Sequence, residues 1–211
     1  KQSSQLVAEG DINNLETATI GIDGEIALSG NWTNNATGST VLADDTHKGT
    51  VTFSGFPTQT IAGSTSTIFE TVELNNTDNL ELSGIDAEVN NQLILTSGKV
   101  ITSAQKLIVS NTATNAIVNE SKSKYILGNL RRYVTNASYK LPVGTSNYLE
   151  LAELDIASST GLDYLDVSFI ENTEAAPANL QVNGNYVVEF LDYGYWNITA
   201  NAGVTAVNYN I

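Results

Sequence analysis

The chain contains no cysteine among its 211 residues, and its longest apolar runs are only a few residues long. Without cysteine, disulfides and thiolate metal sites are excluded, and this is ordinary in large β-stacked bacterial exoproteins. Runs as short as LILT at 93–96 exclude a membrane-spanning helix, which needs about 20 apolar residues. No signal peptide opens the chain, so in an exported protein Lys1 would follow a removed signal or lie within a longer polypeptide.

Charged residues are also scarce, at 15% of the chain, and the basic ones are the fewest. Nine Lys and Arg against 23 Asp and Glu give a net charge of −14. A field of this sign repels phosphate backbones and anionic lipid surfaces, so we expect no nucleic-acid partner and no membrane insertion. The polarity comes instead from Asn, Ser, Thr and Gly, which favour turns and exposed strand positions over helix interiors.

A short apolar word recurs along the first half of the chain. Two apolar residues, two positions apart, precede a small turn in LVAEG (6–10), IALSG (26–30), VTFSG (51–55) and LELSG (80–84), and more loosely in LILTSG (93–98) and LIVSN (107–111). Alternation with a period of two turns successive side chains to opposite faces of a strand. Each word therefore predicts a short β-strand that is closed by a turn.

Asparagine pairs follow several of these words. They end GDINN (10–14), GNWTNN (30–35), IDAEVNN (85–91) and FETVELNN (69–76). Asparagine tolerates left-handed backbone and hydrogen-bonds its own main chain, so these pairs are natural corners between strands.

The first residues of successive words are offset by 20, 25, 29, 13 and 14 residues. The longer offsets resemble one coil of a β-solenoid, and the shorter ones resemble single faces of such a coil. The sequence therefore predicts an all-β chain that begins with an irregular parallel β-helix over residues 1–120. A Greek-key sandwich built from the same short strands is the structural alternative.

The pattern changes near Ser121, where longer alternating strands begin. These are YILGNLRRYV (125–134), YKLPVG (139–144), YLELAELDI (148–156), LDYLDVSFI (162–170), NYVVEFLDY (185–193) and YWNITA (195–200). They predict an antiparallel β-sandwich over 121–211. Because the chain stops on a strand at Ile211, we expect this sandwich to be incomplete and its last strands to lie downstream or to come from a partner.

The order of these words resembles a segment of large secreted surface proteins and adhesin-like proteins of the Bacteroidetes. The resemblance covers residues 24–145 and is carried by GNWTNN, GTVTFSG (49–55), TQTIAGS (58–64), FETVELNN, LILTSGKV (93–100), GNLRRYV (128–134) and YKLPVG. It implies a surface-exposed or released protein, often exported by type IX secretion and used in adhesion, gliding or as a stalk. The family brings no catalytic residues, and its C-terminal sorting domain is not recognisable here.

Residues that could carry chemistry are few. His47 lies in ADDTHKG beside Asp44 and Asp45, where a solvated turn is favoured over a carboxylate dyad or a Ca²⁺ site, because no D-x-D-x-D-G loop is present. Arg131 and Arg132 could serve a lyase-like groove. We expect instead that one of the two arginines packs the aliphatic part of its side chain and donates hydrogen bonds to main-chain carbonyls, while the other faces solvent. With no nucleophile, zinc or phosphate motif either, we expect no enzyme activity and no cofactor.

Threonine and aromatic residues offer two further candidate sites. The T-x-T pairs are Thr50 and Thr52, Thr58 and Thr60, and Thr65 and Thr67. Stacked on one face they would form an ice-binding grid, but their unequal spacing argues against this. Sugar platforms would draw on Trp32, Trp196 and the tyrosines. Trp32 takes the place of Ile12 in the repeated word and is predicted to be core, and one of Tyr195 and Trp196 is predicted to face inward. The N-x-S/T triplets at Asn31 and Asn197 are by-products of composition.

The leading functional hypothesis is an extracellular or cell-surface structural and adhesive segment that supplies reach and presentation without catalysis. Its partners would be the rest of a larger parent chain, like subunits or surface glycans. One alternative is a polysaccharide-binding or polysaccharide-degrading module. Another is a filament-forming subunit that accepts a strand from its neighbour at an open sheet edge.

Overall fold

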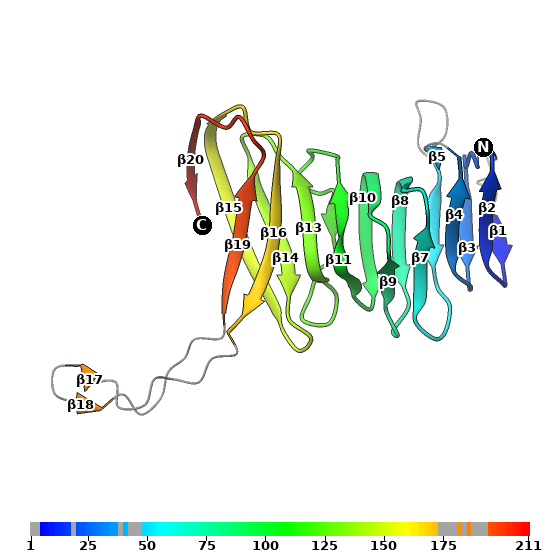
Figure 1. The fold of residues 1–211 in the computed structure, drawn as a ribbon, viewed down its shortest axis with the longest axis horizontal. Coiled ribbons are helices and arrows are strands. Elements are labelled where there is room, and N and C mark those ends of the chain that lie inside the picture. The colour runs from blue at the N-terminus through cyan, green and yellow to red at the C-terminus, as the bar shows by residue number, and fades with distance from the viewer. Residues whose placement is uncertain are drawn as a thin grey trace.

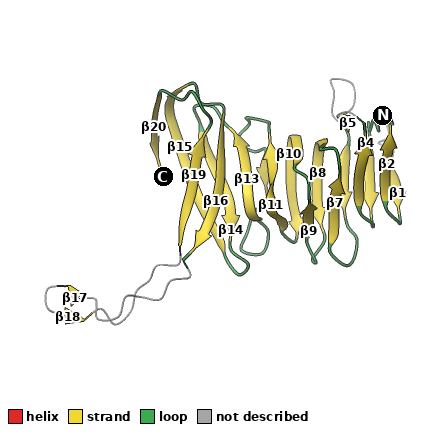
Figure 2. Ribbon diagram, in the orientation of Figure 1, coloured by secondary structure: helices red, strands yellow, loops and turns green. Residues whose placement is uncertain are grey.

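The computed structural model describes residues 5–17, 20–37, 40–41, 48–172, 181–182, 185–186 and 194–211. All regular secondary structure in these ranges is β-strand, as Figure 2 shows, and the predicted all-β class is confirmed. The described residues include no helix with the length and apolarity needed to cross a membrane.

The first two thirds of the chain wind into coils whose strands stack in parallel (Figure 1). Stack A contains β1 (Gln5–Ala8), β3 (Glu25–Leu28), β6 (Thr50–Phe53), the second parts of β8 (Thr67–Asn75) and β10 (Ala87–Ser97), and β12 (Ile117–Val118). Stack B contains β2 (Ile12–Glu16), β4 (Trp32–Ala36), β7 (Gln59–Gly63), β9 (Leu80–Ser83) and the first parts of β11 (Val100–Val109) and β13 (Ile126–Tyr133). Stack C contains β5 (Thr40–Val41), the first parts of β8 and β10, and the second parts of β11 and β13.

This arrangement confirms the predicted irregular parallel β-helix. The chain passes through stacks A, B and C in turn, and each coil lies on the one before it. Each short word offset spans two faces and not the predicted single face, because the chain runs from Leu80 on stack B through stack C to Leu93 on stack A, and from there through stack B to Leu107 on stack C.

Alternation within each strand builds a continuous inner row. In stack A, register pairs join Ile26 to Val51, Val51 to Val72, Val72 to Leu93 and Leu93 to Ile117. Each of the five is at most 8% exposed. Burying a Val, Leu or Ile side chain is worth about 1.5–3 kcal/mol, so repeated coils add up to a substantial core.

The corner at Gly98 shows why the word LILTSG ends with a glycine. Gly98 has a φ of 81°, in the left-handed region, and a Cβ at this position would overlap the carbonyl oxygen of Asn76. Glycine alone combines that backbone with so close an approach.

Parallel pairing ends at β13 in stack C and at β14 (Ser138–Gly144) in stack B, and the pairs beyond these strands are antiparallel. Stack B continues as β14, β15 (Leu149–Thr160) and β20 (Ala206–Asn210). Stack C continues as β16 (Tyr164–Glu171) and β19 (Gly194–Ala200). A separate antiparallel pair joins β17 (Gln181–Val182) to β18 (Asn185–Tyr186). Apart from the parallel pairing of β13 with β11 and β14, these strands are antiparallel as expected, and the incomplete sandwich over 121–211 stays a prediction.

Candidate functional site

Three of the candidate residues, His47, Asp44 and Asp45, lie outside the described residues. Among the residues that are described, no three His, Cys, Asp or Glu side chains come together in a way that would hold a metal ion.

Arg132 is buried in the core at the end of an apolar row. It is 1% exposed and stacks on Val109, which follows Val89 and Phe69 in the same row. Its guanidinium donates to the carbonyl oxygens of Asn111, Ala113 and Tyr133 and lies 5.0 Å from the ring centroid of Tyr139. Burial lowers the pKa of Arg132 to about 10, which still leaves it charged at neutral pH. The predicted carbonyl-bonding arginine is therefore this one.

Arg131 points to the opposite face and belongs to a charged cluster on the outer surface of stack C. Its Nε and Nη2 donate to the two carboxylate oxygens of Asp166 at 2.7 and 2.9 Å, and Lys106 Nζ donates to the same carboxylate at 2.7 Å. These hydrogen bonds, with that of Arg131 first, hold the pKa of Asp166 below its ordinary value. The cluster joins three neighbouring strands, β11, β13 and β16, across the change from parallel to antiparallel pairing.

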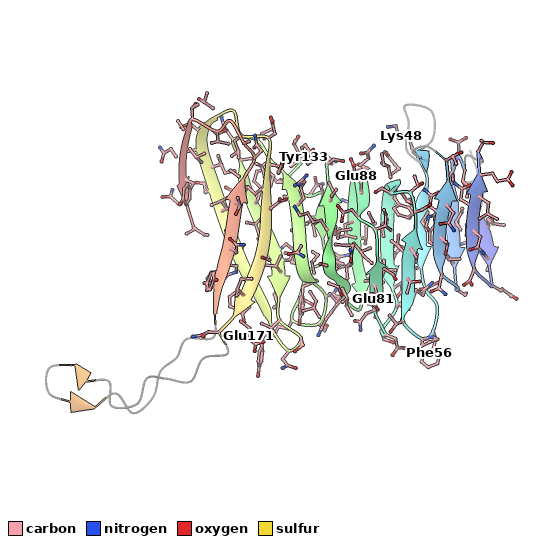
Figure 3. All side chains as sticks on the ribbon, in the orientation of Figure 1. Lys48, Phe56, Glu81, Glu88, Tyr133 and Glu171 are labelled. Atoms are coloured by element: carbon pink, nitrogen blue, oxygen red, sulfur yellow. The ribbon has the colours of Figure 1, made fainter. Side chains whose placement is uncertain are left out.

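An open depression of about 460 Å³ lies beside this cluster. Tyr133 and Tyr164 face each other across the β13–β16 pair, with ring centroids 5.4 Å apart. Thr135, Asn136 and Asp163 are exposed around them. Figure 3 labels Tyr133 at the edge of the molecule, where β13 meets the antiparallel strands. We call these residues the Tyr133–Tyr164 depression.

Sequence reasoning did not find this depression. Tyr133 and Tyr164 belong to different strands, and their pairing depends on β16 joining β13 in antiparallel register. The clustering of tyrosines after residue 125 is a signal for it, but spacing along the chain does not show which two rings meet.

The threonine pairs do not form a single face. Thr50, Thr60 and Thr67 lie on stacks A, B and C respectively. Thr67 is 1% exposed, and its Oγ1 accepts a hydrogen bond from Trp32 Nε1 at 3.0 Å. The ice-binding grid that the T-x-T pattern would need is therefore not built from these three pairs.

The two tryptophans differ sharply in burial. Trp32 is fully buried and pairs with Ile12 in register, as the repeated word predicts. Of the adjacent pair Tyr195 and Trp196, Trp196 faces inward as predicted, into a cleft between the antiparallel layers that Tyr195 does not line. Trp196 is nevertheless 41% exposed, because no other described strand covers this cleft, and Tyr195 is 59% exposed.

This cleft is an apolar opening of about 380 Å³ between β15 and β20 on one side and β16 and β19 on the other. Its lining is apolar or aromatic, and consists of Leu154, Ile156, Leu162, Leu165, Trp196, Ile198, Ala200, Val207, Tyr209 and Ile211. Among the described strands, β19 pairs only with β16 and β20 only with β15.

Hydrogen bonds between polar residues at the corners join positions 20 residues apart along the chain. The offsets between the apolar words do not show this spacing. Asp11 accepts from the backbone N of Asn31, Asn79 from that of Lys99, and Asp86 from that of Lys106, at 2.7–2.9 Å. Asn31 is thus a structural corner residue, and it accepts from Thr60 N as well at 2.8 Å. Asn197, the other triplet asparagine, lies on β19 and pairs with Ser168 on β16.

No family model, curated protein or solved structure matches this chain.

Proposed function

We propose that this chain is a non-catalytic structural segment of a large secreted or cell-surface bacterial protein, where it supplies reach and presents other parts. One observation carries the proposal. A single buried cluster runs from Ile22, just before β3, through the coils that follow to Val167 on β16, so these coils and the antiparallel strands share one core.

The physics of stacking supports a spacer role. Each coil contacts its neighbours, and each added coil lengthens the stack by the strand spacing of about 4.8 Å. The acidic, cysteine-free composition suits a protein outside the cell. The resemblance to Bacteroidetes surface proteins supports the same location, adhesion and type IX export.

The spacer proposal is tested by adding coils. Leu80 pairs with Val100 and Ala87 with Leu107, so residues 80–99 close one circuit of 20 residues. Three further copies of this segment, inserted after Lys99, should lengthen the particle by about 14 Å in small-angle X-ray scattering and keep its β circular dichroism. A control insert of 60 Gly and Ser residues should give no such rigid increment. An unchanged maximum dimension, or loss of β-structure, would contradict the proposal.

Location is tested separately with antibodies against the purified chain. They should label intact producing cells or the culture medium. Labelling that appears after permeabilisation alone would refute a surface or secreted location while leaving the spacer geometry untouched.

The open cleft favours a second candidate function, assembly by strand addition from a second copy. Exposed large apolar side chains gather at both ends of the stack, with Leu6, Val7 and Leu15 on β1 and β2, and Trp196 and Tyr209 on β19 and β20. Among the described strands, β1 and β2 also pair on one side only. A contact between unlike ends repeats from copy to copy and forms a filament.

This second candidate is tested by blocking one end at a time. Leu6→Glu and Tyr209→Glu each alter an exposed side chain at one end. Wild type should form filaments in electron micrographs at rising concentration, and each variant alone should stay monomeric. An equal mixture of the two variants should form dimers and stop there, because each retains one intact end. Monomeric wild type at every concentration would overturn the candidate.

A further inference from the structure

We propose that the Tyr133–Tyr164 depression binds a neutral oligosaccharide. The site belongs to the region where coils meet antiparallel strands, and the inference does not depend on the spacer role. It begins from the two partly exposed rings, which stand opposite each other at 5.4 Å with an interplanar angle of 47°. Pyranose rings carry C–H groups on their faces, and such faces pack on aromatic rings.

The aromatic wall is held in place before any ligand arrives. The guanidinium of Arg131 lies 4.0 Å from the ring centroid of Tyr164. That guanidinium is in turn fixed by its bidentate bond to Asp166, whose carboxylate also binds Lys106. Because the ring is already oriented, binding would lose little conformational entropy at Tyr164.

Polar groups surround the rings at the positions where sugar hydroxyls would lie. The backbone of Asp163 is held at one side, where its N donates to Asn201 Oδ1 at 2.8 Å and its carbonyl oxygen accepts from Val134 N at 2.9 Å. The exposed carboxylate of Asp163 accepts from Asn201 Nδ2 at 3.5 Å. Asn136 is fixed opposite, since its Oδ1 accepts from Ser159 Oγ at 2.8 Å. A few positioned polar groups beside apolar surface are the usual composition of a ligand site.

Charge selects the class of sugar. Asp163 brings a negative charge to the depression and offsets the one net positive charge of the adjacent cluster, in which Arg131 and Lys106 share the carboxylate of Asp166. The depression is therefore close to neutral, within a chain that carries a net charge of −14. Anionic polysaccharides would therefore be repelled. The depression suits uncharged glycans, whose hydroxyls donate to a carboxylate.

The experiment uses the intact 211-residue chain in affinity gel electrophoresis. The probes are four neutral polysaccharides, mannan, xylan, β-1,3-glucan and galactan, with alginate as the anionic probe. At least one neutral polysaccharide should retard wild type, and alginate should not. Titration calorimetry with a hexasaccharide of the retarding polymer then gives the affinity. Retardation by none of the four, or stronger retardation by alginate, would overturn the proposal.

Variants separate recognition from folding. Tyr133→Ala should weaken the affinity about tenfold, whereas Tyr133→Phe keeps the ring and should retain most of it. Asp163→Ala alters an exposed side chain and should also weaken binding with an unchanged melting temperature. Tyr148→Ala, at a 65% exposed tyrosine outside the depression, is the matched control and should bind like wild type. Equal affinity in the Asp163 variant and wild type would refute the site even if Tyr133→Ala unfolds.

Discussion

The parallel coils and the antiparallel strands bury their apolar rows to different extents. In the coils, Val72 and Leu93 lie between neighbours on both sides and are at most 2% exposed. In the antiparallel layers, Leu165 and Val167 on β16 are similarly buried, but Ile198 on the adjacent β19 is only partly covered. Alternation thus sets which side chains face inward, whereas burial requires a neighbouring strand on each side.

Polar side chains also work differently in the two regions. In the coils they link corners 20 residues apart along the stack, as Asp86 does with Lys106. In the antiparallel strands they link hairpin partners or distant turns, as Ser138 does with Asp155 and Asn201 with Asp163. Hydrogen bonds with a single spacing of 20 residues can therefore stabilise successive coils, whereas each turn of the antiparallel layers needs its own contacts.

Replacing each tryptophan by alanine should give the largest contrast between the two regions. Trp32→Ala removes a fully buried ring that packs at 5.3 Å from Phe69, and it should lower the free energy of unfolding by about 3–5 kcal/mol. Trp196→Ala in the open cleft should cost about 1 kcal/mol or less, because the ring is already 41% exposed. Urea denaturation followed by circular dichroism measures both, and equal losses would show that the cleft is closed in solution.

The adjacent arginines should give the next largest contrast. Arg132→Ala removes a side chain that is 1% exposed and leaves three carbonyl oxygens without their donor, so it should lower the free energy of unfolding by about 3 kcal/mol. Arg131→Ala breaks a surface pair and should cost about 1 kcal/mol or less. The same urea titration compares them. A larger loss for Arg131 would mean that the charged cluster, and not the buried guanidinium, holds the junction together.

Two glycines with left-handed backbone test how tightly each region is packed. Gly98 in a coil corner and Gly203 in an antiparallel turn have φ values of 81° and 92°. Gly203→Ala should cost about 1 kcal/mol from backbone strain alone, because nothing lies within 4 Å of the added Cβ. Gly98→Ala should cost about 2–3 kcal/mol, because the Cβ also meets the carbonyl of Asn76. Thermal unfolding of both variants checks this, and equal shifts would contradict the close approach.

The smallest effect concerns pH and the cluster that joins the two regions. Asp166 has a folded-state pKa below its ordinary value, so its stabilisation is present above an unfolded pKa of about 4. That stabilisation is lost as pH falls through the lower folded pKa. Wild type should therefore exceed Asp166→Asn in stability by less than about 1 kcal/mol at pH 7, and the gap should shrink as the pH falls below 4. Urea titrations at pH 7 and pH 2.5 test this, and a gap that widens in acid would contradict it.

Much of the fold could be predicted from the sequence because alternation and glycine corners are local signals. They correctly placed Trp32 over Ile12 and identified the parallel coils. They did not assign each word to a stack, because the words starting at Ile26 and Leu80 read alike although the first lies on stack A and the second on stack B. The 20-residue spacing of polar corners, as from Asp86 to Lys106, would have resolved this.

The candidate site was far less predictable. One of Arg131 and Arg132 was expected to bond carbonyls, but the sequence did not show which, because the donors and acceptors come together only where residues 111–113 pass over the end of the row. Tyr133 and Tyr164 meet because β16 pairs with β13 in antiparallel register. No local sequence pattern predicts this pairing. Long-range pairing, unlike strand formation, depends on the whole arrangement of the sheet.

The corners between stacks A and B have a consequence for how such a chain can diversify. Leu28 pairs with Phe53, and Trp32 pairs with Ile61, so both strands keep their register although the second corner has four more residues than the first. The longer corner carries Phe56, whose side chain is 82% exposed. Insertions at a corner can therefore add new surface chemistry to one coil while the coils above and below stay unchanged. Sequences with this fold can therefore differ in the residues that their corners expose while they keep the same strand register and the same buried rows.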